Sequence, residues 1–272
     1  MKHIVTDEYI ISLLNELRRD IIMMAEHSGH VAVALSCVDI LAALYAEILS
    51  CSPVRVKDPS RDRFILSKGH GCMALYAVLA RMGYIDRRDL ATYGHKGSIL
   101  AEHPLAGKVS GVEWATGSLG HGLAIGAGMA KGLKQQGIGS RVFVLLGDGE
   151  CNEGSVWEAA ALANATRLDN LVAIIDMNGL QACGRYEDIS PDIDLSKCWS
   201  SFGWEVNEVD GHNYRELVHA LGQPAITGRP RVVICHTVKG KGLDFMEGDL
   251  EWHYRPVRGD YRDKALRSLN GA

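Results

Sequence analysis

Two side chains in this sequence, Asp148 and Asn178, are of the types that hold a divalent metal against a diphosphate. Asp148 stands in the triplet Gly147-Asp148-Gly149 and offers a hard carboxylate oxygen, whereas Asn178 offers an amide oxygen. Together with one backbone carbonyl and two phosphate oxygens, these ligands leave little of a magnesium shell for water. The pair therefore predicts a site for a metal and a diphosphate.

Each of these residues follows an apolar run, so the elements that position them are predicted to be buried strands. Residues 141–146 lead directly into Gly147, and residues 171–175 end shortly before Asn178. In a parallel sheet, ligands bind beyond the carboxyl ends of the strands, where loops and helix N-termini converge. Either short sequence alone is more often a tight turn, but their shared placement favours a binding site.

The apolar pattern of the whole chain predicts an α/β fold, a parallel sheet with helices on both faces. Helical spacing runs from Asp7 towards Gly29, and strands alternate with helices after it. Further helices are expected at residues 38–49, 73–81, 119–134, 156–165 and 214–221, and strands at residues 63–66, 141–146, 171–177, 204–209 and 231–235. Four glycines within residues 119–134 indicate close packing of that helix against a neighbour.

The composition fits a soluble globular chain of 272 residues, with 47% hydrophobic and 23% charged residues and a formal net charge of −4. Nothing in it suggests nucleic acid. Glycine or charge interrupts the apolar stretches before bilayer length, and residues 1–4 open no apolar signal region, so we expect no membrane span and a cytoplasmic location. Seven cysteines without a C-x-x-C pair fit reduced thiols. No linker divides the sequence, so residues 1–272 are interpreted as a single domain.

Two other binding motifs fit the sequence poorly. An EF-hand loop starting at Asp148 fails because Glu153 occupies the position that requires glycine and Ala159 that of the closing glutamate. A nicotinamide dinucleotide site is poorly supported, since the glycine pattern of that class occurs only in the helix after Leu119, without a preceding apolar strand.

A series of short motifs, beyond the metal pair, resembles the N-terminal half of transketolases, which use thiamine diphosphate. In chain order the motifs are Ser28-Gly29-His30, Leu66-Ser67-Lys68-Gly69-His70-Gly71, Glu102-His103-Pro104, Gly117-Ser118-Leu119-Gly120, Gly147-Asp148-Gly149 with Asn178, and Trp252-His253. They cover almost the whole chain, which ends about where a full-length transketolase passes into its pyrimidine-binding domain. The resemblance implies the N-terminal subunit of a split transketolase, with the thiamine diphosphate-binding fold of its diphosphate-binding domain.

The resemblance also implies which residues hold the cofactor. Asp148, Asn178 and the carbonyl of Leu180 would bind Mg²⁺, or Ca²⁺ or Mn²⁺ in its place. The residues expected to contact thiamine diphosphate are His70, Gly117, Ser118, Leu119, Asp148, Gly149, Glu153, Asn178, Lys239 and His253. Within this set, Glu153 matches a carboxylate at the subunit interface, where the family links paired active sites.

Three histidines, His30, His103 and His253, are the expected catalytic residues. His30 and His103 match family residues that face the donor sugar, where neutral imidazoles can hydrogen-bond the carbonyl and hydroxyls and pass protons. The segment Val31-Ala32-Val33-Ala34 lacks the proline, glycine or serine common there in relatives. This departure predicts a more apolar wall beside the thiazolium and an unusual substrate preference.

The implied activity is transfer of a two-carbon ketol unit from a ketose or ketose phosphate to an aldose or aldose phosphate. In this family a glutamate of the pyrimidine-binding domain activates the aminopyrimidine, so we expect that domain on a C-terminal partner subunit. The chain alone is then expected to be inactive. Paired active sites imply an α2β2 heterotetramer.

Three alternatives remain open at the level of sequence. The α subunit of a 2-oxo acid dehydrogenase shares the Gly-Asp-Gly to Asn pattern, and a deoxyxylulose phosphate synthase is a nearer enzymatic rival. A non-catalytic binding subunit is the third, although intact Asp148, Asn178 and three motif histidines, His30, His70 and His103, disfavour it.

Overall fold

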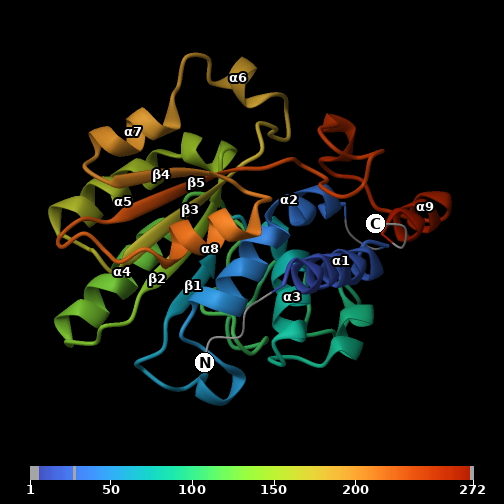
Figure 1. Ribbon diagram of the computed structural model, residues 1–272, viewed down its shortest axis with the longest axis horizontal. Coiled ribbons are helices and arrows are strands. Elements are labelled where there is room, and N and C mark those ends of the chain that lie inside the picture. Colours follow the sequence, from blue (N-terminus) through green and yellow to red (C-terminus); the bar gives the residue numbers. More distant parts are fainter. Residues whose placement is uncertain (1–5, 27–28, 270–272) are drawn as a thin grey trace.

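Five short strands form an all-parallel sheet in the computed structural model, which describes residues 6–26 and 29–269 (Figure 1). They are β1 (Arg63–Leu66), β2 (Val142–Gly147), β3 (Leu171–Met177), β4 (Glu205–Asp210) and β5 (Arg231–His236). Their order across the sheet is β1-β2-β3-β5-β4. The predicted α/β class with a parallel sheet is confirmed, and each strand lies within one residue of its predicted bounds at either end.

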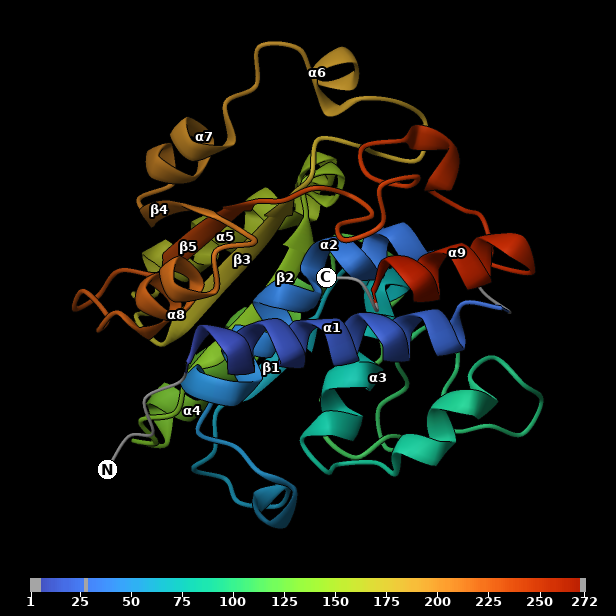
Figure 2. The same ribbon diagram turned by 45° about the vertical axis from the view of Figure 1, so that its right-hand side comes forward.

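Helices cover both faces of the sheet, as the sequence predicts. Alternate residues of a strand point to opposite faces, so Phe143 and Leu145 of β2 enter one core while Val142 and Val144 enter the other. The first core contains residues of α1 (Asp7–Met24), α2 (Val31–Ala43), α3 (Cys72–Arg81), α8 (Tyr214–Gly222) and α9 (Asp260–Ser268). The second contains residues of α4 (Gly122–Gln135), α5 (Gly154–Ala165), α6 (Tyr186–Ile189) and α7 (Leu195–Ser201). Figure 2 shows α1 lying across α2 and α3.

Helix α2 corrects one expectation. It begins at Val31, seven residues before the predicted start at residue 38, because all of its side chains are buried and tertiary packing overrides the low helix propensity of valine. By length and composition alone, residues Val31–Ile48 could cross a membrane, although Asp39 and Glu47 interrupt the apolar stretch. In the structure 83% of that segment is buried inside the protein.

The glycines of α4 pack closely only at its first half. A Cβ at Gly122 would clash with Ser67 and one at Gly126 with Val144, whereas Gly128 and Gly132 have no neighbour within 4 Å. The helices α6, α7 and α9 were not predicted; α6 and α7 are only 4 and 7 residues long. Ser28, the start of one sequence motif, lies outside the described residues.

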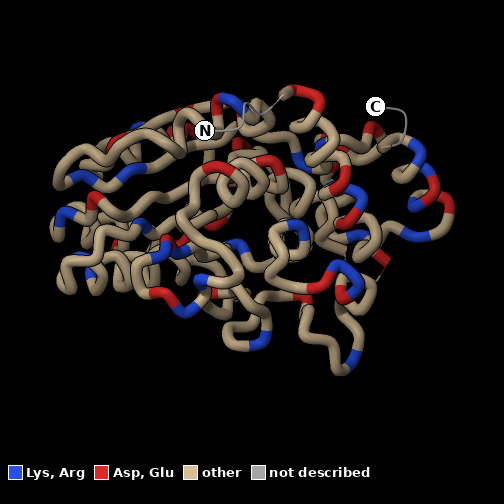
Figure 3. Tube along the Cα trace, turned by 60° about the horizontal axis from the view of Figure 1, so that its bottom comes forward, with Lys and Arg blue, Asp and Glu red and all other residues tan. Residues whose placement is uncertain are grey.

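Acidic and basic residues are interspersed along the described chain (Figure 3). The net charge of −4 is small for the length of the chain. A charged ligand would therefore be attracted by the local charge of its own cleft rather than by a broad surface of one sign.

Candidate active site

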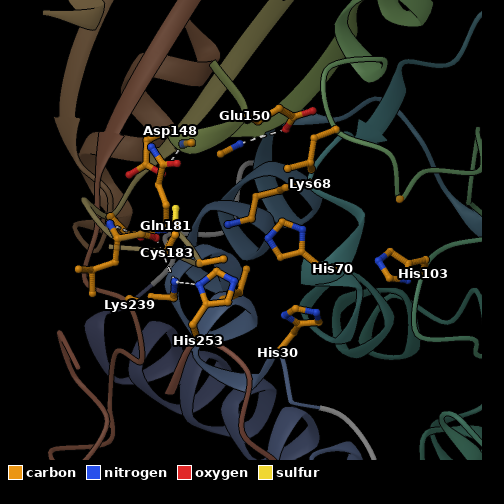
Figure 4. Close-up of a pocket in the computed structure, with 18 residues that line it drawn as sticks. His30, Lys68, His70, His103, Asp148, Glu150, Gln181, Cys183, Lys239 and His253 are labelled. Atoms are coloured by element: carbon orange, nitrogen blue, oxygen red, sulfur yellow. Dashed lines mark hydrogen bonds between the residues drawn. The ribbon is translucent and has the colours of Figure 1, made fainter. Parts of the chain in front are cut away.

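A cleft of about 330 Å³ lies at the carboxyl edge of the sheet, beyond β1, β2, β3 and β5. All of the predicted site residues line this cleft except Ser118 and Glu153. Figure 4 shows Asp148, Lys239 and His253 towards one side of it, and His70 and His103 towards the other. The topology explains this meeting, because the four strands are parallel and neighbouring, so the loops that follow them converge.

Asp148 connects the ends of β2 and β3. Its Oδ1 accepts a hydrogen bond from the Gly149 N–H (2.7 Å), and its Oδ2 accepts one from the Gly179 N–H (2.6 Å). Asn178 Oδ1 accepts from the Leu180 N–H (3.1 Å) within the same loop. Burial and the nearby Asp176 raise the pKa of Asp148 to about 6. This carboxyl group is therefore costly to hold ionised, and a bound cation would favour its charged form.

The donor set at this point fits a hard divalent cation. A carboxylate, an amide oxygen and a backbone carbonyl are ligands that magnesium and calcium prefer. No group of three or more His, Cys, Asp and Glu that could hold a metal is found within the described ranges, so a soft or imidazole-rich metal site is not formed by these residues. The Leu180 carbonyl accepts a hydrogen bond from Lys239 Nζ (3.0 Å), which places an ammonium group beside a predicted metal ligand.

A second cation, Lys68, lies buried at the floor of the cleft. It pairs with Asp176, which also accepts hydrogen bonds from the hydroxyls of Ser36 (2.5 Å) and Thr237. Although burial lowers the pKa of Lys68, the Asp176 carboxylate raises it above its ordinary value, so the ammonium stays charged. The sequence motif contained Lys68, but we predicted no role for it. Asp176, at the end of β3, was also missed because it looks like part of the strand.

Lys239 and His253 form a hydrogen-bonded pair on the Asp148 side of the cleft. The distance from Lys239 Nζ to His253 Nδ1 is 2.5 Å, so Nδ1 is the acceptor and the imidazole is neutral (Figure 4). Burial and Lys68 lower the pKa of Lys239 to about 8, and burial and Lys239 lower that of His253 to about 4. An anion bound between Lys68 and Lys239 would raise the pKa of Lys239 again.

Three of the motif histidines form a ring cluster. The ring centroid of His30 lies 5.2 Å from that of His70 and 5.9 Å from that of His253. Burial and His103 lower the pKa of His30 to about 4, and burial and Lys68 lower that of His70 well below its ordinary value. The imidazoles of His30, His70 and His253 are therefore neutral at physiological pH. In each ring, one nitrogen can donate a hydrogen bond and the other can accept one.

His103 is held by contacts from α3 and from a glycine. Tyr76 donates a hydrogen bond to the Ala101 carbonyl (3.0 Å), and the Cys72 thiol donates to the Glu102 carbonyl (3.1 Å). A Cβ at Gly117 would lie 3.3 Å from His103 Cδ2. Gly117 therefore allows the predicted cofactor segment and the predicted catalytic histidine to approach one another.

Glu150 joins three of the loops that surround the cleft. Its buried carboxylate accepts hydrogen bonds from Ser67 Oγ after β1, from the Gly120 N–H before α4 (2.9 Å) and from the Gly147 N–H at the end of β2 (3.2 Å). Sequence reasoning missed it, because a glutamate in a turn is usually solvated and its three donors lie up to 83 positions away.

Two predicted residues lie beside the cleft instead of in it. Ser118 is exposed and lines a shallow depression with Trp114 and His121. Glu153 is the exposed residue preceding α5, and its Cβ is so close to Gly120 that only glycine fits there. The cofactor contacts expected for Ser118 and Glu153, and the interface role of Glu153, stay predictions. Of the apolar segment after His30, only Val33 reaches the cleft, and the loop residues Gln181 and Cys183 line it without having been predicted.

The chain is similar in sequence to transketolases and to the subunits of divided transketolases. The family described as transketolase, thiamine diphosphate binding domain, matches residues 6–270. An apulose-4-phosphate transketolase subunit of Actinobacillus succinogenes is 43% identical over 256 residues, 93% of this chain and 93% of that protein. The 6-deoxy-6-sulfo-D-fructose transketolase subunit SqwG of a Clostridium strain is 41% identical over 242 residues, 89% of this chain and 88% of that protein.

The same similarity holds for solved structures. The transketolase of Pichia stipitis, in complex with sedoheptulose 7-phosphate, superposes with a TM-score of 0.88 at 29% identity and covers 97% of this chain. This chain spans 40% of the length of that transketolase chain. The superposition therefore includes nearly all of this chain.

Proposed function

The chain belongs to the transketolase family, as an N-terminal subunit that binds thiamine diphosphate, and from this premise we propose how its cleft takes part in the reaction. A divalent cation, Mg²⁺ by preference, is held by Asp148, Asn178 and the Leu180 carbonyl and anchors the diphosphate. The assembled enzyme transfers a two-carbon ketol unit from a ketose or ketose phosphate to an aldose or aldose phosphate. The family match and the named transketolase subunits favour this function over the 2-oxo acid dehydrogenase and deoxyxylulose phosphate synthase alternatives.

The observation that carries this proposal is the meeting of two buried lysines with the Asp148 and Asn178 loops in one cleft. Lys68 and Lys239 supply positive charge, while Asp148 and Asn178 supply hard oxygens for a metal. A diphosphate with its metal needs both kinds of group at once. Further donors at this edge are the imidazoles of His70 and His253.

The catalytic roles follow from the neutral histidine cluster. When bound, thiamine diphosphate supplies the nucleophilic carbon and the electron sink that cleavage of a carbon–carbon bond requires. His30 and His103 orient the ketose by hydrogen bonds to its carbonyl and hydroxyl oxygens. Burial and His103 hold the pKa of His30 at about 4, so the His30 imidazole is neutral and can both donate and accept such hydrogen bonds. Lys239 holds His253 in one tautomer, and His253 helps His30 and His103 to orient the ketose.

The sugar class is proposed from the relatives and from Val33. The relatives named above act, by their names, on apulose 4-phosphate and on 6-deoxy-6-sulfo-D-fructose. Val33 places an apolar side chain in the cleft, directly after the His30 segment. We propose that this wall selects among ketose donors, and that the acceptor is an aldose or aldose phosphate.

The remainder of the active site is proposed to come from a partner subunit with the pyrimidine-binding domain. The relatives of similar length are themselves named as transketolase subunits, and the chain spans 40% of a solved transketolase chain. Leu105 and Trp114, on the loops beside the cleft, are 42% and 48% exposed, and apolar side chains at such a rim suit coverage by another protein. An α2β2 complex in the cytoplasm is the proposed state, with Glu153 at the interface between paired sites.

The test of the proposed function is reconstitution with the partner. The chain is purified alone and together with the partner subunit, each with Mg²⁺ and thiamine diphosphate, and ketol transfer is measured over a panel of ketose donors. Activity is expected only from the assembled pair. Full ketol transfer by the chain alone would overturn the proposed division of the active site.

A further inference from the structure

Gln181 lies in a tight turn that points into the cleft between the ends of β2 and β3. Leu180 and Arg185 form an isolated antiparallel bridge, and the Gln181 N–H donates to the Gly184 carbonyl (2.9 Å). The Leu180 carbonyl is held in addition by Lys239. The turn therefore gives the Gln181 side chain a fixed starting point, and Figure 4 shows that side chain on the Asp148 side of the cleft.

The Gln181 amide lies directly over Gly149. A Cβ built on Gly149 would approach Gln181 Cγ and Cδ to 2.9 Å and Oε1 to 3.1 Å. Any larger residue at position 149 would displace the amide, so the glycine makes room for Gln181 as well as for a ligand. Gly149 is also where the diphosphate is proposed to bind.

The amide nitrogen of Gln181 is buried and has no hydrogen-bond partner within the described part of the chain. Both oxygens of the Asp148 carboxylate, which lines the same cleft, already accept from backbone N–H groups. A buried amide N–H without a hydrogen-bond partner is energetically costly, so this donor is best satisfied by an acceptor that enters the cleft. Because Lys68 and Lys239 line the same cleft, the acceptor that fits is an anion with several oxygens.

We propose that Gln181 is a further diphosphate-binding residue, whose Nε2 donates a hydrogen bond to a phosphate oxygen of the bound cofactor above Gly149. This inference rests on the proposed function, because it assumes that the diphosphate lies beside Asp148. It makes the loop after Asn178 contribute twice: the Leu180 carbonyl holds the metal, and the next side chain holds the phosphate.

In the alternative role, the Gln181 side chain blocks the ligand site and must move away before the ligand can enter. The two roles predict changes of opposite sign. If Gln181 is a hydrogen-bond donor, removing its amide weakens binding of the diphosphate. If its side chain blocks the site, making it smaller strengthens binding. Gln181→Leu removes both hydrogen-bonding atoms at similar volume, Gln181→Ala removes the bulk as well, and Gln181→Glu keeps the shape but adds a negative charge.

The test is calorimetric titration of the full chain with magnesium pyrophosphate, and of the chain assembled with its partner subunit with thiamine diphosphate and Mg²⁺. We expect Kd to rise about tenfold for Gln181→Leu and Gln181→Ala, and about 100-fold for Gln181→Glu, with both probes. Gln223→Leu is the matched control, because that glutamine is bonded to His219 at the exposed end of α8, and its Kd should equal that of the wild type.

Unchanged or tighter binding by Gln181→Leu and Gln181→Ala would overturn the proposal, as would a loss confined to thiamine diphosphate, which would place the contact on the rings. Asp148→Ala separates the two proposals. If it abolishes binding while the Gln181 variants do not weaken it, only the role of Gln181 fails. If the wild type and Asp148→Ala bind alike, or neither binds, the proposed function fails as well. Gln181→Met replaces Gln181→Leu if the latter lowers the melting temperature.

Discussion

Two charged side chains of the cleft, Asp148 and Lys239, have no hydrogen-bond partner of opposite charge among the described residues. Lys68 is neutralised by Asp176, but among the described residues Lys239 has only neutral hydrogen-bond partners, and Asp148 has only backbone donors. The shifted pKa values of Asp148 and Lys239 both reflect charges that burial disfavours. A metal beside Asp148 and a diphosphate beside Lys239 would remove both costs, which is why we expect the two to bind cooperatively.

Replacing Asp148 tests the metal clamp. Asp148→Ala removes the one carboxylate of the proposed metal site and also the link between the β2 and β3 loops. We expect the affinity for thiamine diphosphate in Mg²⁺ to fall by about 100-fold or more, since even an indirect partner of a metal is worth 10–100-fold. Titration with and without Mg²⁺ measures this, and Asp263→Ala, an exposed position on α9, is the control. Equal affinities for the two variants would contradict the clamp.

Lys239 should make cofactor binding depend on pH. Its pKa is lowered to about 8 in the free chain by burial and Lys68, and a bound diphosphate raises it again. Only the protonated lysine attracts the anion, so the affinity is greatest below pH 8 and falls as the pH rises above it. We expect about a tenfold loss between pH 7 and pH 9.5. Binding titrations across this range measure it; Lys239→Met should bind weakly with no such slope, and an equal slope in that variant would exclude Lys239 as the cause.

At the scale of the elements, the loops around the cleft are joined by Glu150. It connects the end of β1, the start of α4 and the end of β2 through Ser67, Gly120 and Gly147. Glu150→Ala leaves these donors buried and unpaired, so we expect the free energy of unfolding to fall by about 1–3 kcal/mol. Urea unfolding measures it.

Two further variants give the Glu150 experiment its controls. Glu150→Gln keeps an acceptor oxygen and should lose less stability than Glu150→Ala, and Glu158→Ala on the exposed side of α5 should lose almost none. A weaker affinity for thiamine diphosphate should accompany the loss at Glu150, because Gly117, Leu119 and Gly147 line the cleft. Equal stability of the two alanine variants would show that Glu150 does not join the loops.

The sequence was sufficient to predict the strands and the polar residues that follow them. Buried parallel strands are continuous apolar runs, such as residues 171–175, and the polar residue after each run then falls at the carboxyl edge. The start of α2 could not be predicted, because the β-branched residues Val31 and Val33 favour a helix only once they are buried. Glu150 and Gln181 could not be found either, since their roles depend on partners that only the tertiary structure brings near.

At the scale of the whole molecule, we propose that the cleft is one half of an active site. Among the described residues, every group proposed to hold the metal and the diphosphate comes from this one chain. The groups proposed to activate the aminopyrimidine come from another chain, and the exposed Leu105 and Trp114 mark the rim at which it would dock. This division predicts that variants of Asp148 or Gln181 change cofactor affinity in both the free and the assembled chain.

The most direct measurement is ketol transfer by mixtures of this chain with its partner, at concentrations of Mg²⁺ and thiamine diphosphate that just saturate the wild-type complex. We expect no transfer by either protein alone, transfer that rises with the partner until the two are equimolar, and none when the mixture contains Asp148→Ala in this chain. Transfer by this chain alone, or by a mixture containing Asp148→Ala at the wild-type rate, would contradict this expectation.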